Sequence, residues 1–415
     1  MSYIMHNTLP ACRAAADTLA AATPEKIDNA LIAVADAVEA AADEIIAANA
    51  ADCETMDSSA SSCGRLRLDR SRIADIVSAI RQIAALPSPV GVELASAKRP
   101  NGMLIRRISV PFGIIGVIFE DRPDVAFDAF ALCFKAGSAC VLNPEHEATH
   151  TVEKAVEVIR RGLLAQGFAP GCIAMLDGGH DATLELLRAR GTVDLIIPRG
   201  SRRLIDFVRD NARVPVIETG AGVCHTFFHA AGDIATGRDI IYNAKTRRVD
   251  ACNALDCLLV DRSRLTDLPA LCYRLSEKNV TIYADNEAFH ALEGAYPLLE
   301  KATEDHYEHE WLDYKLTVRV VDGIDEAIEH IARHGSHHSE CIITENRPAA
   351  EQFLRRVDAA CVYSNVSTAF TDGAQFGFGA EMGISTQKLH ARGPIGLSGL
   401  CTYKFLVTGA GQTRP

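Results

Sequence analysis

One cysteine in the sequence stands where a nucleophile would be expected. Cys252 follows a predicted helix and precedes the apolar strand predicted at 258–260, so it falls in a loop. The neighbouring Lys245, Arg247 and Arg248 favour the thiolate, which is the reactive form of a cysteine. A loop cysteine that only packs is nevertheless the more common case. The residues alone therefore make Cys252 a candidate nucleophile.

A carboxylate and a candidate anion-binding loop follow two other predicted strands. Glu218 comes after the apolar segment 214–217 and before a glycine-rich turn, at the strand edge where ligands bind in open α/β sheets. It could serve as a base, a proton relay or a cofactor contact, or it could cap the turn. In the loop 198–203, Gly200 and Ser201 would offer backbone N–H groups to a phosphate at the start of a helix. A surface turn is the more frequent explanation of such a string.

The densest group of polar residues lies near the C-terminus. Lys388, His390 and Arg392 fall within the segment 376–394, which also carries four glycines. Glycine-rich loops with basic side chains suit anionic ligands. The interleaved aromatic and aliphatic residues argue against disorder, so the segment is predicted to be a functional loop.

The cysteines and histidines show no disulfide or metal pattern. The 13 cysteines are odd in number and scattered, without paired or zinc-type spacing, and no signal peptide is recognisable at the start. They are typical of reduced thiols in the cytoplasm, most of them buried. The histidines at 337–338 and at 306 and 309 lack supporting ligands, so no metal is predicted.

Length and composition indicate an ordinary globular protein. The 415 residues suggest two or three domains, with 48% hydrophobic and 23% charged residues. Lys and Arg number 42 against 54 Asp and Glu, a net charge of -12. This balance argues against general binding to nucleic acid or to an anionic membrane, although a local basic pocket is compatible with it. The sequence has no apolar run of about 18 residues, so no transmembrane helix is expected.

Strands alternate with helices in two successive blocks, after helices predicted at 11–51 and 66–86. In the first block, strands are predicted at 104–110, 113–119, 139–142, 173–176, 193–198 and 214–217, and helices at 125–136, 149–166 and 181–190. In the second block, helices are predicted at 234–244, 324–334 and 349–357, and strands at 254–260, 316–321, 340–344 and 360–363. This order predicts doubly wound α/β sheets, with a domain boundary near 243–248. A single large α/β domain is the alternative.

Taken together, these segments resemble the γ-glutamyl phosphate reductase family of the aldehyde dehydrogenase superfamily. The resemblance spans nearly the whole chain and is strongest at 119–124, 196–200, 215–220, 243–246 with 252–254, and 371–394. The last of these runs is long and highly specific. The implied fold is α/β and aldehyde-dehydrogenase-like, with two doubly wound Rossmann-like domains and a small β oligomerisation arm.

The resemblance also implies a division of the chain. We expect a cofactor-binding domain at 1–243, of which 101–112 contributes to the oligomerisation arm. A catalytic domain is expected at 244–370 and a substrate loop region at 371–397. The segment 398–415 would supply the C-terminal oligomerisation strand, so a homo-oligomer is expected.

The activity implied by the resemblance is the NADPH-dependent reduction of L-glutamate 5-phosphate to L-glutamate 5-semialdehyde in proline biosynthesis. Cys252 would be the nucleophile that forms a thioester and releases phosphate. Glu218 precedes it at a spacing like that of the superfamily and would tune the thiol or handle a proton. Asn253 would lie near the oxyanion. The alternatives are an NAD-linked dehydrogenase that oxidises a semialdehyde to the acid, and an inactive α/β protein that binds a nucleotide or a partner enzyme.

The resemblance places further residues at the cofactor. Glu310 is similar to the glutamate that holds the nicotinamide ribose in the superfamily. The string Asn143-Pro144-Glu145 stands where relatives carry an arginine, so Arg202 or Arg203 would have to meet the 2′-phosphate of NADPH. The cofactor-binding residues implied in this way are Pro198, Gly200, Ser201, Arg202, Gly220, Asn143 and Glu310.

Substrate and partners follow from the same resemblance. Arg122, in a string more acidic than that of the relatives, would bind the substrate together with Lys388, His390 and Arg392. The substrate is too labile to diffuse far, which makes a glutamate 5-kinase a conceivable partner. Nucleic acid and membranes are not expected as partners.

Overall fold

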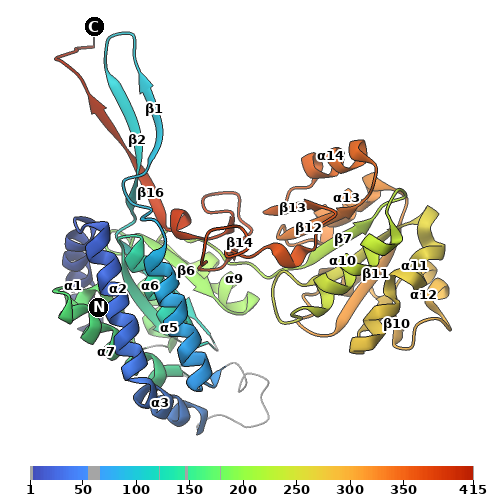
Figure 1. Cartoon of the computed structure of the whole chain (residues 1–415), viewed down its shortest axis with the longest axis horizontal. Helices are drawn as coiled ribbons and strands as arrows, with labels where there is room; N and C mark the ends of the chain where they lie inside the picture. The colour runs from blue at the N-terminus through green and yellow to red at the C-terminus, as the bar shows by residue number, and fades with distance from the viewer. Residues whose placement is uncertain (1–2, 55–65, 121, 145–147, 178, 415) are drawn as a thin grey trace. The chain divides into compact units, whose positions relative to one another are not determined.

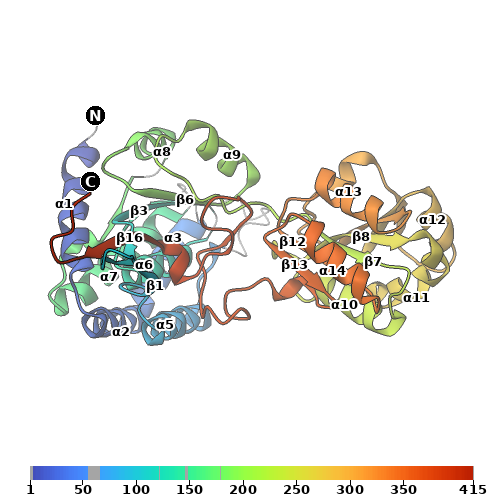
Figure 2. The ribbon, with the colours of Figure 1, turned by 90° about the horizontal axis from the view of Figure 1, so that it is seen from above.

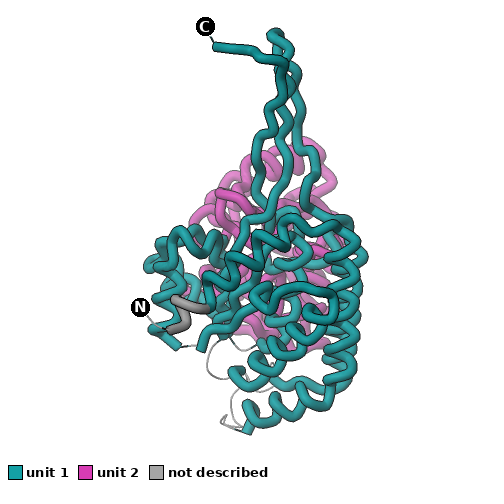
Figure 3. The backbone as a smooth tube through the Cα atoms, turned by 90° about the vertical axis from the view of Figure 1, so that its left-hand side faces the viewer, with its two compact units in different colours: residues 1–219, 377–383, 395–415 teal, residues 220–376, 384–394 magenta. Residues whose placement is uncertain are grey.

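The computed structural model describes residues 3–54, 66–120, 122–144, 148–177 and 179–414. Glu145 of the string at 143–145 therefore lies outside the described residues. The chain forms two compact units, coloured separately in Figure 3. Unit 1 comprises Met1–Thr219, Gly377–Gly383 and Ile395–Pro415, and unit 2 comprises Gly220–Phe376 and Ile384–Pro394.

The core of unit 1 is a parallel sheet of four strands in the order β5-β4-β3-β6. Its strands are β3 (Ile114–Phe119), β4 (Ala139–Pro144), β5 (Ile173–Met175) and β6 (Leu195–Arg199). Every residue of β3 and β4 is buried. A strand covered on both faces needs a continuous apolar run, which is why these strands were predictable from sequence.

Helices cover both faces of this sheet (Figure 2). One face carries α6 (Val125–Lys135) and α7 (Thr149–Ala165), and the other carries α1 (Tyr3–Ala20), α8 (Gly179–Arg188) and α9 (Arg202–Asn211). An outer layer of α2 (Pro24–Ala40), α3 (Ala42–Glu54) and α5 (Arg70–Ala85) packs against α6 and α7. A Cβ atom at Gly162 of α7 would lie 2.7 Å from the Cα atom of Val34, so this glycine permits the close approach of α2.

Three antiparallel strands extend from unit 1 as an arm (Figure 1). They are β1 (Glu93–Lys98), β2 (Leu104–Pro111) and β16 (Cys401–Thr408), in the order β1-β2-β16. The register of β2 and β16 runs from Cys401 opposite Pro111 to Thr408 opposite Leu104. The arm therefore joins the end of the described chain to a segment close to the start of the α/β core.

Unit 2 contains a parallel sheet of seven strands in the order β10-β9-β11-β8-β7-β12-β13. The strands are β7 (Cys224–Phe228), β8 (Leu255–Asp261), β9 (Thr281–Ala284), β10 (Leu299–Lys301), β11 (Lys315–Val321), β12 (Ser339–Ile343) and β13 (Cys361–Ser364). Strands β7, β8 and β12 are buried along their whole length and form the centre of the sheet.

Two apolar clusters pack on the faces of this second sheet. One lies under α10 (Ile234–Thr246), α11 (Leu268–Cys272) and α12 (Asn286–Leu292). The other lies under α13 (Ile324–His334) and α14 (Arg347–Arg356). A short antiparallel pair, β14 (Ile384–Ser385) and β15 (Gly393–Pro394), lies within the predicted substrate loop region and flanks its residues 386–392.

The structure differs from the sequence-based expectations in three places. The units divide after Thr219, so 220–243 belongs to unit 2, because β7 pairs with β8 and β12. The strand expected at 214–217 is reduced to a single bridge between Val216 and Ile196. Between 262 and 312 the structure contains short helices and strands that we did not predict.

No disulfide joins cysteines in the described ranges. Among the described helices, none combines the length and the apolar character that crossing a bilayer requires.

Candidate active site

Cys252 lies in unit 2, in the turn between α10 and the amino end of β8, and it is partly exposed. The turn that precedes β7 runs directly against it. A Cβ atom at Gly222 would lie 1.7 Å from the carbonyl oxygen of Cys252, so no other residue fits there without displacing the loop. The glycine-rich turn thus shapes the backbone around the thiol.

Glu310 supports the same turn. Its Oε1 atom accepts a hydrogen bond of 2.9 Å from the N–H of Gly222. Burial raises the pKa of the Glu310 carboxyl, while the Gly222 hydrogen bond opposes that rise. The residue expected at the nicotinamide ribose therefore also positions the glycine that touches the Cys252 backbone.

A buried polar network lies behind Cys252. The Cys224 thiol donates to the carbonyl oxygen of Cys252 at 3.3 Å and lies 3.6 Å from Nδ1 of His338. Nδ1 of His338 is 2.8 Å from the hydroxyl of Ser339, which in turn is 2.6 Å from the hydroxyl of Thr371. Burial lowers the pKa of His338 to about 4 and raises that of Cys224 well above its usual value. The network is therefore neutral and holds the backbone of the loop.

The side chain of Asn253 is turned into this framework. Its Nδ2 atom donates to the backbone carbonyl oxygens of Thr371 at 2.9 Å and Ala369 at 3.4 Å. These contacts use both amide hydrogens. The backbone carbonyl oxygen of Asn253 accepts a hydrogen bond of 2.8 Å from the hydroxyl of Thr368. We had placed Asn253 near the oxyanion, but the structure gives its side chain the role of fixing the loop. The backbone N–H groups at Cys252 stay candidates for that role.

Two of the three basic side chains expected to act on Cys252, Lys245 and Arg248, are paired with aspartates. Lys245 is fully buried, with Nζ 3.5 Å from Oδ1 of Asp256. Burial lowers the pKa of Lys245 and raises that of Asp256 to about 7. Arg248 is exposed and pairs with Asp250 at 3.1 Å. Of the three basic residues near the thiol, Arg247 is the one that reaches a pocket.

That pocket has a volume of about 650 Å³ and lies within unit 2. Asn243 lines it from α10 and Arg247 from the position directly after this helix, while Ser367 and Gln375 line it from the segment after β13. The same segment carries Ala369, whose carbonyl binds the amide of Asn253, the residue next to Cys252. A largely apolar pocket, with Arg247 and Asp239 as charged lining residues, is thus linked to the cysteine loop.

Two of the three basic residues of the C-terminal loop, Lys388 and Arg392, form ion pairs with the same carboxylate. Nζ of Lys388 lies 2.7 Å from Oδ2 of Asp358, and Nη2 of Arg392 lies 2.8 Å from its Oδ1. These two cations lower the pKa of Asp358 to about 2. The carboxylate therefore offsets the positive charge that we expected to meet the substrate. His390 is exposed in the same loop.

In unit 1, candidate cofactor residues lie at the carboxyl ends of the parallel strands. Asn143, at the end of β4, is buried; its Nδ2 donates to Thr183 at 2.8 Å, while its Oδ1 has no hydrogen-bond partner among the described residues. A buried orphan acceptor at this edge fits a ribose hydroxyl. Arg202, in the first turn of α9, is well exposed.

The start of α9 is already held by a carboxylate. Ser201 caps the helix by accepting from the N–H of Leu204 at 3.3 Å. Its own N–H donates to Oε2 of Glu120 at 2.7 Å, and a Cβ atom at Gly200 would lie 2.4 Å from the same oxygen. Glu120 thus occupies the position where we expected a phosphate. The carbonyl oxygen of Pro198 accepts from Thr219 at 2.6 Å, which ties the end of β6 to the end of unit 1.

A group of alternating charges lies beyond β3 and β6. Desolvation and the Asp124 carboxylate raise the pKa of Asp128 to about 6, against the opposing charges of Arg199 and Arg122. Desolvation lowers the pKa of Arg199. Arg122 therefore belongs to this group of charges in unit 1. Glu218 also lies in unit 1, whereas Gly220 is the first residue of unit 2.

Within each unit, the candidate residues gather at one end of the strands, and this end differs between the two sheets. In unit 1 the candidate residues follow the carboxyl ends of β3, β4 and β6, as in most open α/β sheets. In unit 2 they precede the amino ends of β7, β8 and β11. Cys224, His338 and Thr371 are far apart in the sequence and approach one another only in the fold, so their local sequence gave no signal of this network.

Comparison with solved structures defines the class of fold first. An acetylating aldehyde dehydrogenase from Geobacillus thermoglucosidasius matches with a TM-score of 0.70 at 18% identity, covering 99% of this chain and 97% of that chain. The chain therefore has the aldehyde dehydrogenase fold, which confirms the predicted fold class.

Sequence relatives then define the family. The chain is 51% identical to the γ-glutamyl phosphate reductase of Bacteroides thetaiotaomicron, over 100% of both proteins, and 54% identical to that of Phocaeicola vulgatus, over 97% of both. The γ-glutamyl phosphate reductase structure from Thermotoga maritima matches with a TM-score of 0.95 at 38% identity, over 99% of this chain and 100% of that one. No family model matches the chain. The chain belongs to the γ-glutamyl phosphate reductase family and is an oxidoreductase.

Proposed function

We propose that the chain reduces L-glutamate 5-phosphate to L-glutamate 5-semialdehyde with NADPH, in proline biosynthesis, through a thioester on Cys252. The observation that carries the proposal is the loop built around this cysteine. Gly222 packs against the carbonyl oxygen of Cys252, Cys224 donates to the same oxygen, and Glu310 holds Gly222 in place through its N–H. Full-length similarity to γ-glutamyl phosphate reductases supports the substrate.

The covalent step needs a thiolate and a stabilised oxyanion. The Cys252 thiolate attacks the acyl carbon, the carbon–oxygen bond to phosphate breaks, and phosphate leaves. Backbone N–H groups of the loop hold the oxyanion in the tetrahedral intermediate. The hydrogen bond from Cys224 and the close packing of Gly222 fix the loop before the substrate arrives, so little reorganisation is needed.

Reduction of the thioester uses the cofactor. When bound, NADPH would supply the hydride. Its candidate binding residues lie in unit 1, apart from Gly220 and Glu310, which belong to unit 2. Asn143 would accept a ribose hydroxyl through its orphan oxygen, and the exposed Arg202 would meet the 2′-phosphate. Collapse of the resulting hemithioacetal returns the thiolate of Cys252 and releases the aldehyde. Glu218 would handle the proton.

The pocket of unit 2 is proposed to hold the glutamyl part of the substrate. Arg247 is exposed in it and provides a cation for the α-carboxylate. Ser367 and Asn243 provide hydrogen-bonding groups. Arg122, Lys388, His390 and Arg392 stay candidates for the phosphate, although Asp358 must be displaced for Lys388 or Arg392 to act.

The exposed arm supports a homo-oligomer. Tyr403, Phe405 and Val407 alternate along β16, so they project from one face of the arm, and their exposed fractions are 53%, 59% and 57%. Apolar side chains exposed in a row are typical of protein interfaces. A glutamate 5-kinase stays a candidate partner because the substrate is labile.

The reverse reaction tests the function. Purified protein is incubated with glutamate 5-semialdehyde and NADP⁺, with and without inorganic phosphate, and NADPH is followed by absorbance. We expect turnover that depends on phosphate and is lost in Cys252→Ala but kept in Cys361→Ala, a cysteine at the start of β13. Formation of glutamate without phosphate would instead identify a hydrolytic dehydrogenase.

A further inference from the structure

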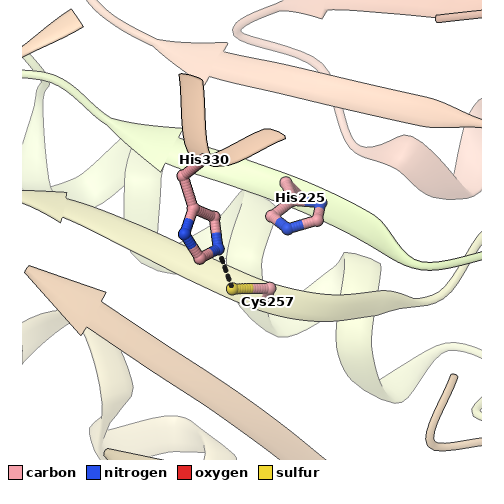
Figure 4. Close-up of side chains that lie close together, drawn as sticks. All are labelled: His225, Cys257 and His330. Carbon is pink, nitrogen blue, oxygen red and sulfur yellow. Dashed lines mark hydrogen bonds between the residues drawn. The ribbon is translucent and has the colours of Figure 1, made fainter. Parts of the chain in front are cut away.

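Three side chains in the interior of unit 2 bring metal-binding atoms together (Figure 4). His225 on β7 is the strand neighbour of Cys257 on β8, and His330 reaches the same place from α13. One ligand atom from each lies within 4.8 Å of the other two, and Sγ of Cys257 is 3.8 Å from Nε2 of His330. The cluster sits on the sheet face covered by α13.

A fourth polar side chain backs the cluster. Glu340 on β12 is paired with His225 in the strand register, and its Oε2 lies 3.2 Å from Nδ1 of His225. Oε2 also accepts a hydrogen bond of 2.8 Å from the backbone N–H of His225. Glu340, His225 and Cys257 therefore stand side by side on three adjacent strands.

The side chains of this group are buried, and several of their polar atoms lack hydrogen-bond partners among the described residues. His225 and Glu340 have no exposed surface, and His330 is 5% exposed. Nε2 of His225 and Oε1 of Glu340 make no hydrogen bond with any residue that the structure describes, and Nδ1 of His225 has only the 3.2 Å contact with Oε2 of Glu340. Buried polar groups are nearly always hydrogen-bonded, so a protein rarely keeps several unpaired in one place without a further partner.

We propose that His225, Cys257 and His330 bind one Zn²⁺ ion in the interior of unit 2. Histidine nitrogen and cysteine sulfur are the preferred ligands of zinc. Tetrahedral zinc would place a sulfur and a nitrogen ligand about 3.5 Å apart, close to the observed separation of Cys257 and His330. His225 needs a small movement toward the other two.

Glu340 is the outer carboxylate of this site. It faces Nδ1 of His225, and a carboxylate on the far nitrogen of a histidine ligand fixes the ring and strengthens its bond to zinc. Binding releases the Cys257 proton, so the dication is balanced by one thiolate and one carboxylate. The buried group is then neutral overall, which removes the main cost of placing charges in a protein core. A water molecule would complete the coordination.

The site is tested on the full chain, independently of enzymatic activity. Protein expressed in zinc-supplemented medium and purified without chelators is analysed by inductively coupled plasma mass spectrometry. We expect about one zinc per chain. Expression with cobalt in place of zinc should give a thiolate-to-cobalt charge-transfer band and the visible absorption of tetrahedral Co²⁺.

Two variants separate ligation from a general effect on the core. Cys257→Ser should remove the charge-transfer band and lower the bound metal at least tenfold. Cys341→Ser changes an equally buried cysteine on β12 outside the cluster and should keep both. Circular dichroism checks that each variant is folded. Wild-type protein with less than about a tenth of an equivalent of zinc and no cobalt band would overturn the proposal, as would equal metal retention in the two variants.

Discussion

The thiol of Cys224 donates a hydrogen bond to the carbonyl oxygen of Cys252, 3.3 Å away. Cys224 is the first residue of β7, and Cys252 lies in the turn that precedes the neighbouring strand β8. This contact links the proposed nucleophile to the buried network of His338, Ser339 and Thr371. The loop that carries the proposed nucleophile is thus positioned by a hydrogen-bonded network of buried side chains.

Removal of this hydrogen bond should affect turnover more than substrate binding. Cys224→Ala should lower kcat about threefold to tenfold, since a net hydrogen bond contributes about 0.5 to 1.5 kcal/mol. Cys224→Ser keeps a donor and should restore most of kcat. Steady-state kinetics in the phosphate-dependent assay separates kcat from KM. An equal loss in both variants would show that packing volume, rather than the hydrogen bond, is responsible.

Arg247 should govern the affinity for the glutamyl substrate. Arg247→Gln removes the cation from the pocket and should raise KM for the semialdehyde about tenfold to a hundredfold, the value of a charge-assisted hydrogen bond. KM for NADP⁺ should not change. Arg248→Gln is the matched control, because Arg248 pairs with Asp250 rather than lining the pocket. Similar effects in the two variants would contradict the assignment.

Arg202 and Arg203 should decide between NADPH and NADH. The double variant Arg202→Ala, Arg203→Ala should raise KM for NADPH about tenfold and leave KM for NADH unchanged, because only NADPH carries the 2′-phosphate. Arg209→Ala, at the far end of α9, pairs with Asp206 and is the control. If the preference for NADPH survived the double variant, another part of unit 1 would have to bind the phosphate.

The apolar face of β16 should be required for assembly. Phe405→Asp places a charge among exposed apolar side chains and should shift the protein toward monomers in size-exclusion chromatography with light scattering. Lys404→Asp introduces the same charge on the opposite face of the strand and should leave the mass unchanged. A monomeric wild-type protein would contradict the proposed role of the arm.

His338 should make stability depend on pH. Its pKa is about 4 in the folded chain, against 6.5 for an ordinary histidine, so the unfolded chain binds a proton that the folded one does not. Stability is therefore lost as the pH falls from 6.5 toward 4, at up to about 1.4 kcal/mol per pH unit. Urea titrations should show a shallower dependence for His338→Gln, whereas the exposed His309→Gln should behave like the wild type. An unchanged slope in His338→Gln would show that another group accounts for the proton.

Local patterns in the sequence were sufficient for most of the two sheets. Buried strands such as β3 and β8 are uninterrupted apolar runs, and helices such as α7 repeat their apolar residues at helical spacing. Strand β7 was missed because its sequence, Cys-His-Thr-Phe-Phe, starts with polar residues that are nevertheless fully buried. The error in the boundary between the units follows from that single strand.

Only one member of the candidate site, Cys252, could be selected from its own position in the sequence. Cys252 stood out by its neighbours in the sequence, and the family resemblance strengthened the choice. Lys245 could not be distinguished from Arg247, because only the fold shows that Lys245 turns inward to Asp256. The same holds for Asp358, which neutralises Lys388 and Arg392 from a distant part of the sequence.

The pairing of β2 with β16 has a consequence for how the protein is made. Residues 104–111 are synthesised long before residues 401–408, with which they pair in the finished sheet. During synthesis, β2 therefore has one open edge while the rest of the chain leaves the ribosome, and open strand edges invite pairing with other chains. A nascent chain stalled before residue 401 should consequently be more prone to aggregation than the finished protein.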